Sequence, residues 1–278
     1  MAGELERARK AVRELNKTLK NLPSDSSPPP KQVHNLRTAS RRVEAIAAAL
    51  AQVEGGESRR ALKTIEPIRK AAGGVREMDV LLANARRLAR TSAGDSLTRL
   101  VEHLQRARQQ NAVVLRRALA RRRVAARESL KQYSRFIRSA LDSRKSTASA
   151  NGLPAHWHEG VHAAAMNVVR ELGEWPPFNA ENIHAFRLKV KVLRYILQLS
   201  GDANSALEET LGNVQRRIGD WHDWQQLEEI AGQLLSMERD GALLTRISAI
   251  SSRKFHQALK AANTLRGKYL TMPLAQGI

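Results

Sequence analysis

The fold of this chain is decided by the stretch VHNLRTASRRV, residues 33–43, in which basic and apolar side chains alternate at helical spacing. Successive residues of an α-helix turn by about 100°, so Arg37 and Arg41 lie within about 60° of His34. The apolar side chains fall on the other side of the same helix: Val33, Leu36, Val43 and Ala47. The stretch therefore predicts a helix with its apolar side in a core and a first basic face made of His34, Arg37 and Arg41.

A second stretch, IHAFRLKVKVL at residues 183–193, repeats this arrangement. Its second basic face consists of His184, Arg187, Lys191 and Arg194. The side chains expected in the core are Ile183, Phe186, Val190, Leu193 and Leu197. The first basic face extends about 10 Å along its helix, at about 1.5 Å per residue. Donors repeated over this length suit an extended chain of phosphates better than a single phosphate group.

The two stretches are part of a longer internal repeat. At an offset of 150, the first stretch matches the second at His34/His184, Leu36/Phe186, Arg37/Arg187, Arg41/Lys191 and Ile46/Ile196. At an offset of 146, further matches are Gly73/Gly219, Arg76/His222, Glu77/Asp223 and Leu81/Leu227. Two sets of matches in the same order indicate a duplicated helical unit within one domain, 1–278. The predicted repeats are residues 1–145 and 155–278, joined by a linker at 143–155.

Composition and periodicity predict an all-α chain. Apolar residues make up 42% of the sequence and aromatic residues only 4%, whereas strands favour β-branched and aromatic residues. No segment shows the two-residue alternation of a strand, and the chain has no cysteine. Breaks are expected at Gly73-Gly74, at 218–220 and near 239–242. The predicted helices are 2–21, 31–53, 57–72, 75–91, 95–142, 157–171, 180–200, 204–217, 220–238 and 241–270.

The charge of the chain points to a polyanionic partner. Lys and Arg number 47 against 27 Asp and Glu, a net charge of +20. The excess is uneven, since residues 101–150 carry a net +10 and residues 201–250 a net −5. Such a field attracts nucleic acid, anionic lipid or polyphosphate, and does not choose among them. The sequence shows no apolar run long enough to span a membrane and no export signal, so a cytoplasmic protein is expected.

Four motifs resemble those of the CHAD family, the conserved histidine α-helical domain. The stretches at 33–43 and 183–195 resemble its two histidine-bearing helices, and AGGVREMDVLL (72–82) and IGDWHDWQQLEE (218–229) resemble the segments that follow them. The resemblance implies two pseudo-symmetric four-helix units around a basic central cleft or pore, and binding of inorganic polyphosphate. If polyphosphate is the ligand, polyphosphate granules are a further candidate partner. The family's basic positions correspond to His34, Arg37, Arg41, Arg42, His184, Arg187, Lys191 and Arg194. Val192 stands where the first stretch has Arg42, and Glu77 replaces the family's usual Asp.

Further basic residues are expected to widen the site. They are Lys63, Arg69, Arg76, Arg216 and Arg217. The arginines between 116 and 127 occupy too many helix faces to form one binding surface, so part of that run should be solvated. Four acids, Glu77, Asp79, Asp220 and Asp223, are expected to begin helices after glycine and cap their free N–H groups.

Two alternatives remain beside polyphosphate binding. A nucleic-acid-binding helical protein is the first, although Trp157, Trp175, Trp221 and Trp224 do not alternate with basic runs and are expected in helix packing. A scaffold that docks on an anionic granule or partner is the second. His158, Glu159 and His162 form an H-E-x-x-H pattern, which is typical of zinc proteases, but a catalytic zinc site is not expected here. No catalytic residue, metal or cofactor is predicted, and nucleic acid is expected only as a weaker competitor.

Overall fold

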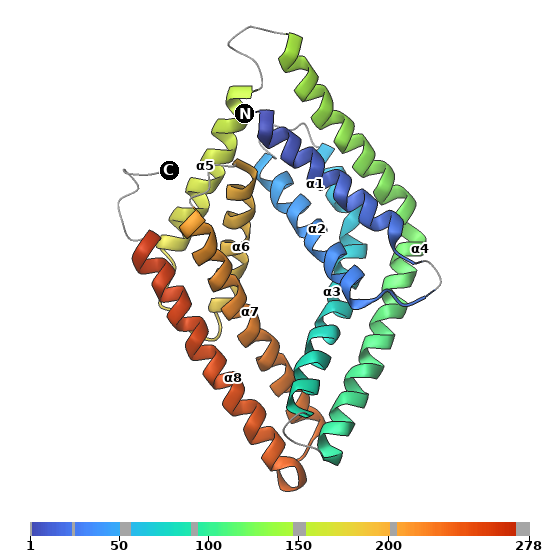
Figure 1. Ribbon diagram of the computed structural model, residues 1–278, viewed down its shortest axis with the longest axis vertical. Coiled ribbons are helices and arrows are strands. Elements are labelled where there is room, and N and C mark those ends of the chain that lie inside the picture. The colour runs from blue at the N-terminus through green and yellow to red at the C-terminus, as the bar shows by residue number, and fades with distance from the viewer. Residues whose placement is uncertain are drawn as a thin grey trace. The chain divides into compact units, whose positions relative to one another are not determined.

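The protein is all-α in the residues that the structure describes, which are 2–23, 26–50, 57–89, 94–146, 154–200 and 205–270 of a computed structural model. These residues form eight α-helices and one short π-helix, with no strand (Figure 1). The helices are α1 (Ala2–Asn21), α2 (Pro30–Leu50), α3 (Glu57–Ala89), α4 (Asp95–Ser146), α5 (Pro154–Gly173), α6 (Ile183–Ser200), α7 (Ser205–Leu234), α8 (Met237–Leu265) and η1 (Arg266–Leu270). The predicted all-α class is confirmed.

Two predicted helix breaks are wrong. Helix α3 runs without interruption through Gly73 and Gly74, and α7 runs through Gly219. Each glycine inside a helix costs about 1 kcal/mol relative to alanine, so glycine alone suggested a helix end. A third predicted break, near 239–242, is displaced, because α7 ends at Leu234 and α8 begins at Met237. From residue 95 onward the sequence predicted one or two very long helices without a break; the structure has one, which ends at Ser146.

The chain divides into two compact units. Unit 1 comprises Met1–Gly74, Asn111–Val169 and Val192–Ala203, and unit 2 comprises Val75–Gln110, Arg170–Lys191 and Asn204–Ile278. Helices α3, α4, α5 and α6 each contribute residues to both units. These units cut across the predicted repeats 1–145 and 155–278, so the duplication stays a prediction.

Unit 1 contains α1, α2, the first half of α3, the second half of α4, most of α5 and the second half of α6. Helix α2 begins at Pro30, a residue whose fixed φ and missing N–H suit the first turn of a helix. The side chains expected on its apolar face, Val33, Leu36, Val43 and Ala47, are all buried. The predicted amphipathic pattern of the helix that carries the first basic face is therefore confirmed.

Helix α1 contacts α4 through Arg127, whose Nε donates to the side-chain oxygen of Asn16 at 3.1 Å.

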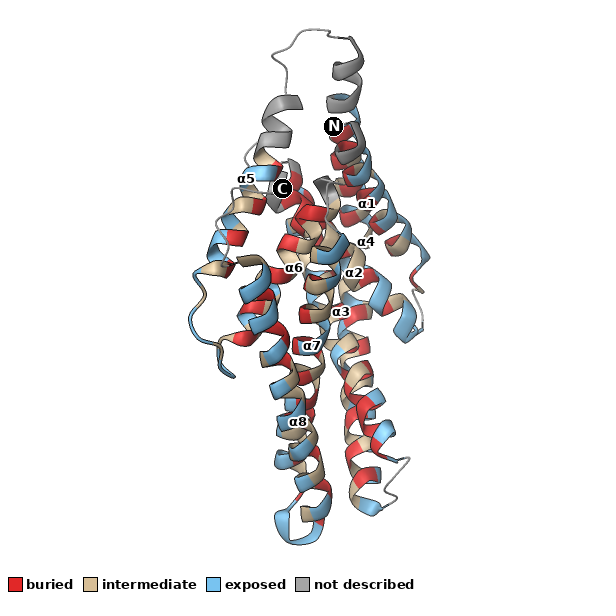
Figure 2. Cartoon of the chain, turned by 60° about the vertical axis from the view of Figure 1, so that its left-hand side comes forward, coloured by how far each residue is buried: buried red, intermediate tan, exposed pale blue. Residues whose placement is uncertain are grey.

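Unit 2 has a core shared by α7, α8, the second half of α3 and the first half of α4. Figure 2 shows the buried residues as stripes along these helices. The core includes Leu81, Leu88, Leu100, Leu104, Trp224, Leu227, Leu243 and Ile247. The apolar side chains predicted on α6 are also buried: Ile183, Phe186 and Val190 in unit 2, and Leu193 and Leu197 in unit 1. No helix in the described parts of the chain is long and apolar enough to cross a bilayer.

The connection from α5 to α6 fixes where the second basic face begins. The Asn179 side-chain oxygen accepts hydrogen bonds from the backbone N–H groups of Glu181 and Asn182, at 3.0 and 2.9 Å. Phe178 stacks edge-on against the buried ring of Phe186, with ring centroids 4.7 Å apart. The Arg266 guanidinium lies over Phe178 and donates to the Trp175 carbonyl at 2.8 Å. This connection therefore holds the first turn of α6, which carries His184.

Candidate functional site

In unit 1, arginines from two helices gather around one phenol. Tyr195 is half-buried near the end of α6, and burial raises the pKa of its phenol. Four positive charges oppose that rise, because they favour the phenolate. In decreasing order of effect, they belong to Arg42, Arg194, Arg41 and Arg37. We call these four arginines, with Tyr195, the unit 1 cluster.

A carboxylate on α2 holds two of the basic side chains in place. Glu44 accepts from Arg41 Nη1 at 2.9 Å through one oxygen and pairs with Arg69 Nε at 3.0 Å through the other. Only 16% of the Arg69 side chain is exposed, so its ion pair is less screened by water than a surface pair. Arg42 meets Glu14 only at 3.5 Å, with both side chains largely exposed, and that pair contributes little. Arg69 therefore orients Arg41 through Glu44.

Arg37 lies against α3 at Gly73. A methyl group placed on Gly73 would be 3.4 Å from Arg37 Nη1, an ordinary van der Waals contact. His34 lies one turn earlier on α2 and is exposed. The first basic face is therefore open to solvent at His34 and packed against α3 at Arg37.

In unit 2, Arg187 makes the corresponding contact more tightly. Its Nε donates to the backbone carbonyl of Gln215 on α7 at 3.0 Å. A methyl group placed on Gly219 would lie only 2.9 Å from Arg187 Nη2 and 3.2 Å from its Nε. The glycine in the middle of α7 thus provides the space in which the guanidinium lies against the helix.

Two histidines meet beside this arginine. The rings of His184 on α6 and His222 on α7 lie edge to face, with centroids 4.2 Å apart and planes at 62°. His222 was matched to Arg76 in the sequence repeat but not assigned to the site. Its position three residues after Gly219, on a helix that receives Arg187, was the signal that could have identified it. We call His184, Arg187, His222 and Asp223 the unit 2 cluster.

Asp223 is the acid of the unit 2 cluster. Burial raises the pKa of its carboxyl group, and the neighbouring charge of Asp220 adds to the rise. The charges of Arg187, His222 and Arg76 act in the opposite direction. Arg76, on α3, therefore lies within electrostatic reach of Asp223, as the prediction that it joins the site requires. The cluster thus places one arginine and two histidines of α6 and α7 beside a carboxyl group whose ionised form is disfavoured by burial, with Arg76 of α3 nearby.

The four acids that were expected to cap helices do not do so, because all of them lie inside α3 or α7. Only 3% of the Asp79 side chain is exposed, and its carboxylate pairs with Arg108 Nε at 2.6 Å. Glu77 accepts from the Gln226 side-chain nitrogen at 2.9 Å, and Asp220 pairs with Lys254 at 3.4 Å. These carboxylates link neighbouring helices of unit 2.

Comparison with known proteins assigns the chain to a family. The model of the CHAD domain matches residues 6–232. The chain belongs to the CHAD family. It resembles the CHAD domain from the plant Ricinus communis with a TM-score of 0.64 and 16% identity, covering 96% of this chain and 91% of that one. It resembles PptA from Streptomyces chartreusis with a TM-score of 0.55 and 14% identity, covering 96% of each chain. No curated protein matches the sequence significantly.

Within this CHAD domain, some predicted site residues have other contacts. Lys63 is exposed and lies about 120° around α3 from Arg69, so it does not share the face that carries Arg69, Gly73 and Arg76. Arg217 donates to Gln257 of α8 at 3.1 Å, and Arg216 is exposed. Lys191 is half-buried, on the stripe of α6 that carries His184 and Arg187. Lys63 is thus separated from the clusters, and neither Arg216 nor Arg217 has a described contact with them.

The second basic face does not remain one group. His184, Arg187 and Lys191 belong to unit 2, whereas Arg194 belongs to unit 1 and joins the arginines of α2 near Tyr195. Of the arginine run on α4, Arg123 donates to the Pro23 carbonyl at 3.2 Å. That contact, together with the contact of Arg127 with Asn16, gives part of the run a packing role.

The tryptophans and the H-E-x-x-H pattern were also tested in part. Trp221 and Trp224 are buried in α7, as expected, and Trp175 lies at the α5–α6 connection. His162 is exposed, while the side chains of Trp157, His158 and Glu159 fall outside the described residues. Among the side chains that are described, no group of three or more His, Asp or Glu could hold a metal ion.

Proposed function

We propose that this CHAD domain binds inorganic polyphosphate through the unit 1 and unit 2 clusters. The observation that carries the proposal is that each basic face brings an arginine against a glycine of a neighbouring helix: Arg37 at Gly73 and Arg187 at Gly219. The hydrogen bond to Gln215 holds the Arg187 guanidinium in position before any ligand arrives, and Arg37 packs against α3 at Gly73. Further basic side chains lie near both. Polyphosphate is the ligand that the resemblance to the CHAD family implies.

The chemistry of the clusters suits a chain of phosphates. Arginine presents planar, permanently charged donors that can contact two oxygens of one phosphate. Holding the side chain in advance lowers the conformational entropy lost on binding. Neither cluster offers an exposed aromatic platform for bases, because Tyr195 is half-buried and the tryptophans of α7 are in the core. This favours polyphosphate over nucleic acid, which stays the alternative.

The two arginine–glycine contacts also support the proposed internal duplication. Arg37 and Arg187 are matched in the repeat at an offset of 150, and Gly73 and Gly219 at an offset of 146. In each repeat, the matched arginine contacts the matched glycine of the same repeat. Chance similarity between helical segments gives no reason for this pairing. We therefore propose that residues 1–145 and 155–278 descend from one helical unit.

We further propose that the protein binds its ligand without hydrolysing it. Glu77 is engaged with Gln226. Burial raises the pKa of Asp223, and a carboxylate with a raised pKa is a better base, so Asp223 is the residue on which hydrolysis would have to depend. The test is phosphate release from long-chain polyphosphate by purified protein, compared with the Asp223→Asn variant. Release that scales with protein concentration and disappears in the variant would contradict the proposal.

The binding proposal is tested by competition at fixed ionic strength. Labelled long-chain polyphosphate bound to the protein is displaced by unlabelled polyphosphate, single-stranded RNA, duplex DNA, ATP or orthophosphate. Polyphosphate should compete best, orthophosphate should compete poorly, and affinity should fall as salt rises because binding releases counterions. Arg37→Gln and Arg187→Gln should each weaken binding by about tenfold, against a control, Arg135→Gln, on the exposed surface of α4. Equal displacement by duplex DNA of matched charge would favour the nucleic-acid alternative.

A further inference from the structure

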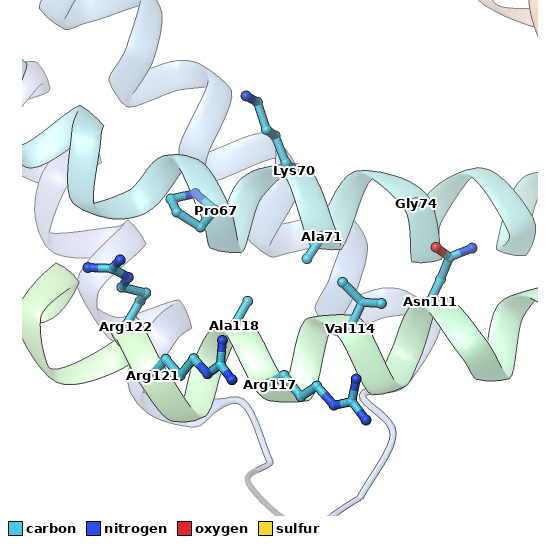
Figure 3. A pocket seen from close by; sticks show the side chains of 10 residues that line it. All are labelled: Pro67, Lys70, Ala71, Gly74, Asn111, Val114, Arg117, Ala118, Arg121 and Arg122. Atoms are coloured by element: carbon cyan, nitrogen blue, oxygen red, sulfur yellow. The ribbon is translucent and has the colours of Figure 1, made fainter.

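A groove lies between α3 and α4 in unit 1, on a different face of α3 from the unit 1 cluster. Its lining consists of Pro67, Lys70, Ala71 and Gly74 from α3 and Asn111, Val114, Arg117, Ala118, Arg121 and Arg122 from α4 (Figure 3). Gly74 and Gly73 are neighbours in sequence, yet about 100° apart around the helix. Gly73 therefore faces Arg37 while Gly74 faces α4.

The middle of the groove is apolar. Figure 3 shows Ala71 directed toward α4, and Val114 and Ala118 directed toward α3. Val114 is 51% exposed, which is unusual for a valine between two packed helices. These side chains form an apolar floor that lacks a covering element in the described part of the chain.

One end of the groove is closed by a specific contact. A methyl group on Gly74 would lie 2.8 Å from the side-chain oxygen of Asn111, so the two helices are in close contact there. From Asn111 to Arg122 the groove extends along α4 for 11 residues, or about 16 Å. This length corresponds to about three turns of a further α-helix.

The rim of the groove is positively charged. Arg117, Arg121 and Arg122 are exposed, and none of them has an ion pair with a carboxylate among the described residues. Lys70 is also exposed and pairs with Glu66 at 2.7 Å. The groove thus has an apolar floor and three cations whose charge is not neutralised by neighbouring acids.

We propose that this groove is a docking site for an acidic amphipathic helix of a partner protein. A helix with apolar side chains at every third or fourth position would cover Val114 and Ala118, while its flanking Asp and Glu side chains would pair with the arginines of the rim. Polyphosphate has no apolar surface with which to cover the floor. A flat bilayer suits protruding apolar side chains, whereas here they lie in a concave floor between helices. The proposal does not depend on the proposed polyphosphate function.

The experiment uses a defined probe and matched variants of the full chain. The probe is a fluorescein-labelled peptide of about 14 residues, with leucine at every third or fourth position and glutamate at the flanking positions, measured by fluorescence anisotropy. Val114→Asp places a negative charge on the floor and should weaken peptide binding by about tenfold or more. Val124→Asp is its control, because Val124 is 82% exposed on the same helix, is not part of the groove, and its replacement changes the net charge equally. Polyphosphate affinity should be the same for both variants.

A second pair of variants tests the rim and does not depend on the floor. Arg121→Glu should weaken peptide binding by about fivefold, and Arg135→Glu, also exposed on α4 but outside the groove, by less than about twofold. If Val114→Asp fails to fold, this pair decides the question. A scrambled peptide of the same composition should bind weakly, since it cannot present one apolar face.

Three outcomes would overturn the proposal. Equal weakening by Val114→Asp and Val124→Asp, or by Arg121→Glu and Arg135→Glu, would mean that the peptide responds only to net charge. Equal binding of the scrambled peptide would show that no helical face is recognised. Val114-dependent binding to phosphatidylserine vesicles without binding of the peptide would assign the groove to a membrane surface instead.

Discussion

Replacing Gly219 with alanine separates the stability of α7 from the function of Arg187. The new methyl group would lie 2.9 Å from Arg187 Nη2 and 3.3 Å from its Cζ, closer than atoms can pack without movement. The atoms in its way belong to the end of a flexible side chain, so the backbone of α7 can stay in place. We therefore expect the guanidinium to move away and to lose its hydrogen bond to the Gln215 carbonyl.

The two contributions to stability nearly cancel. Alanine in place of glycine inside a helix stabilises the folded protein by up to about 1 kcal/mol. Loss of the Arg187 hydrogen bond costs about 1 kcal/mol. The net change in the free energy of unfolding should therefore be close to zero. Polyphosphate affinity should fall about three- to tenfold, because Arg187 must then be ordered when the ligand binds.

Two other glycines provide matched controls. Gly232 lies on the same helix, and a methyl group added there would meet open space, so Gly232→Ala should give the stabilisation of about 1 kcal/mol without a cost. At Gly73 the methyl group would be 3.4 Å from Arg37, so Gly73→Ala should leave both Arg37 and polyphosphate binding almost unchanged. Urea denaturation measures the first quantity, and titration with labelled polyphosphate at fixed salt measures the second.

Two results would refute the expected dependence of Arg187 on the space at Gly219. One is a Gly219→Ala variant that is stabilised as much as Gly232→Ala and binds polyphosphate as tightly as the unsubstituted protein. The other is a large loss of stability in Gly219→Ala, since that would mean that α7 itself had to move.

Three further predictions follow from the site and its neighbours. Because burial raises the pKa of Asp223, the folded protein loses stability as pH rises from the ordinary pKa of an aspartate through this raised pKa. Asp223→Asn should therefore melt at a higher temperature than the unsubstituted protein at neutral pH, and at the same temperature below about pH 4. A lower melting temperature of the variant at neutral pH would contradict this. If His34 and His184 are phosphate ligands, polyphosphate should bind more tightly as pH falls from about 8 to about 6, because a bound polyanion favours the imidazolium form. A double variant, His34→Gln with His184→Gln, should lose this dependence, and its persistence in isothermal titrations would exclude the histidines. Arg108→Ala should lower the free energy of unfolding by about 3 kcal/mol, because it leaves the carboxylate of Asp79 buried without its guanidinium partner. Arg106→Ala, on the exposed side of α4, should change the free energy of unfolding little in the same urea denaturation experiment.

The sequence was sufficient for properties that depend on local spacing. Helical periodicity depends only on residues three and four apart, so the buried and basic sides of α2 and α6 could be predicted side chain by side chain. The motifs that resemble CHAD proteins are equally local, and the family they indicated is confirmed.

The tertiary structure decided how those local elements are used. A glycine such as Gly219 lowers helix propensity, and in the sequence alone this indicates a helix break. In the fold, Arg187 fills the space of the missing methyl group and the helix continues. The roles of Asp79 and Asp223 likewise depend on Arg108, Arg187 and Arg76, which come from other helices or distant turns. The assignment of Arg194 to a different unit from Arg187 follows from which helices pack against each end of α6. Contacts between helices far apart in sequence have no signature in local spacing, because their free energy is gained only after the helices have packed.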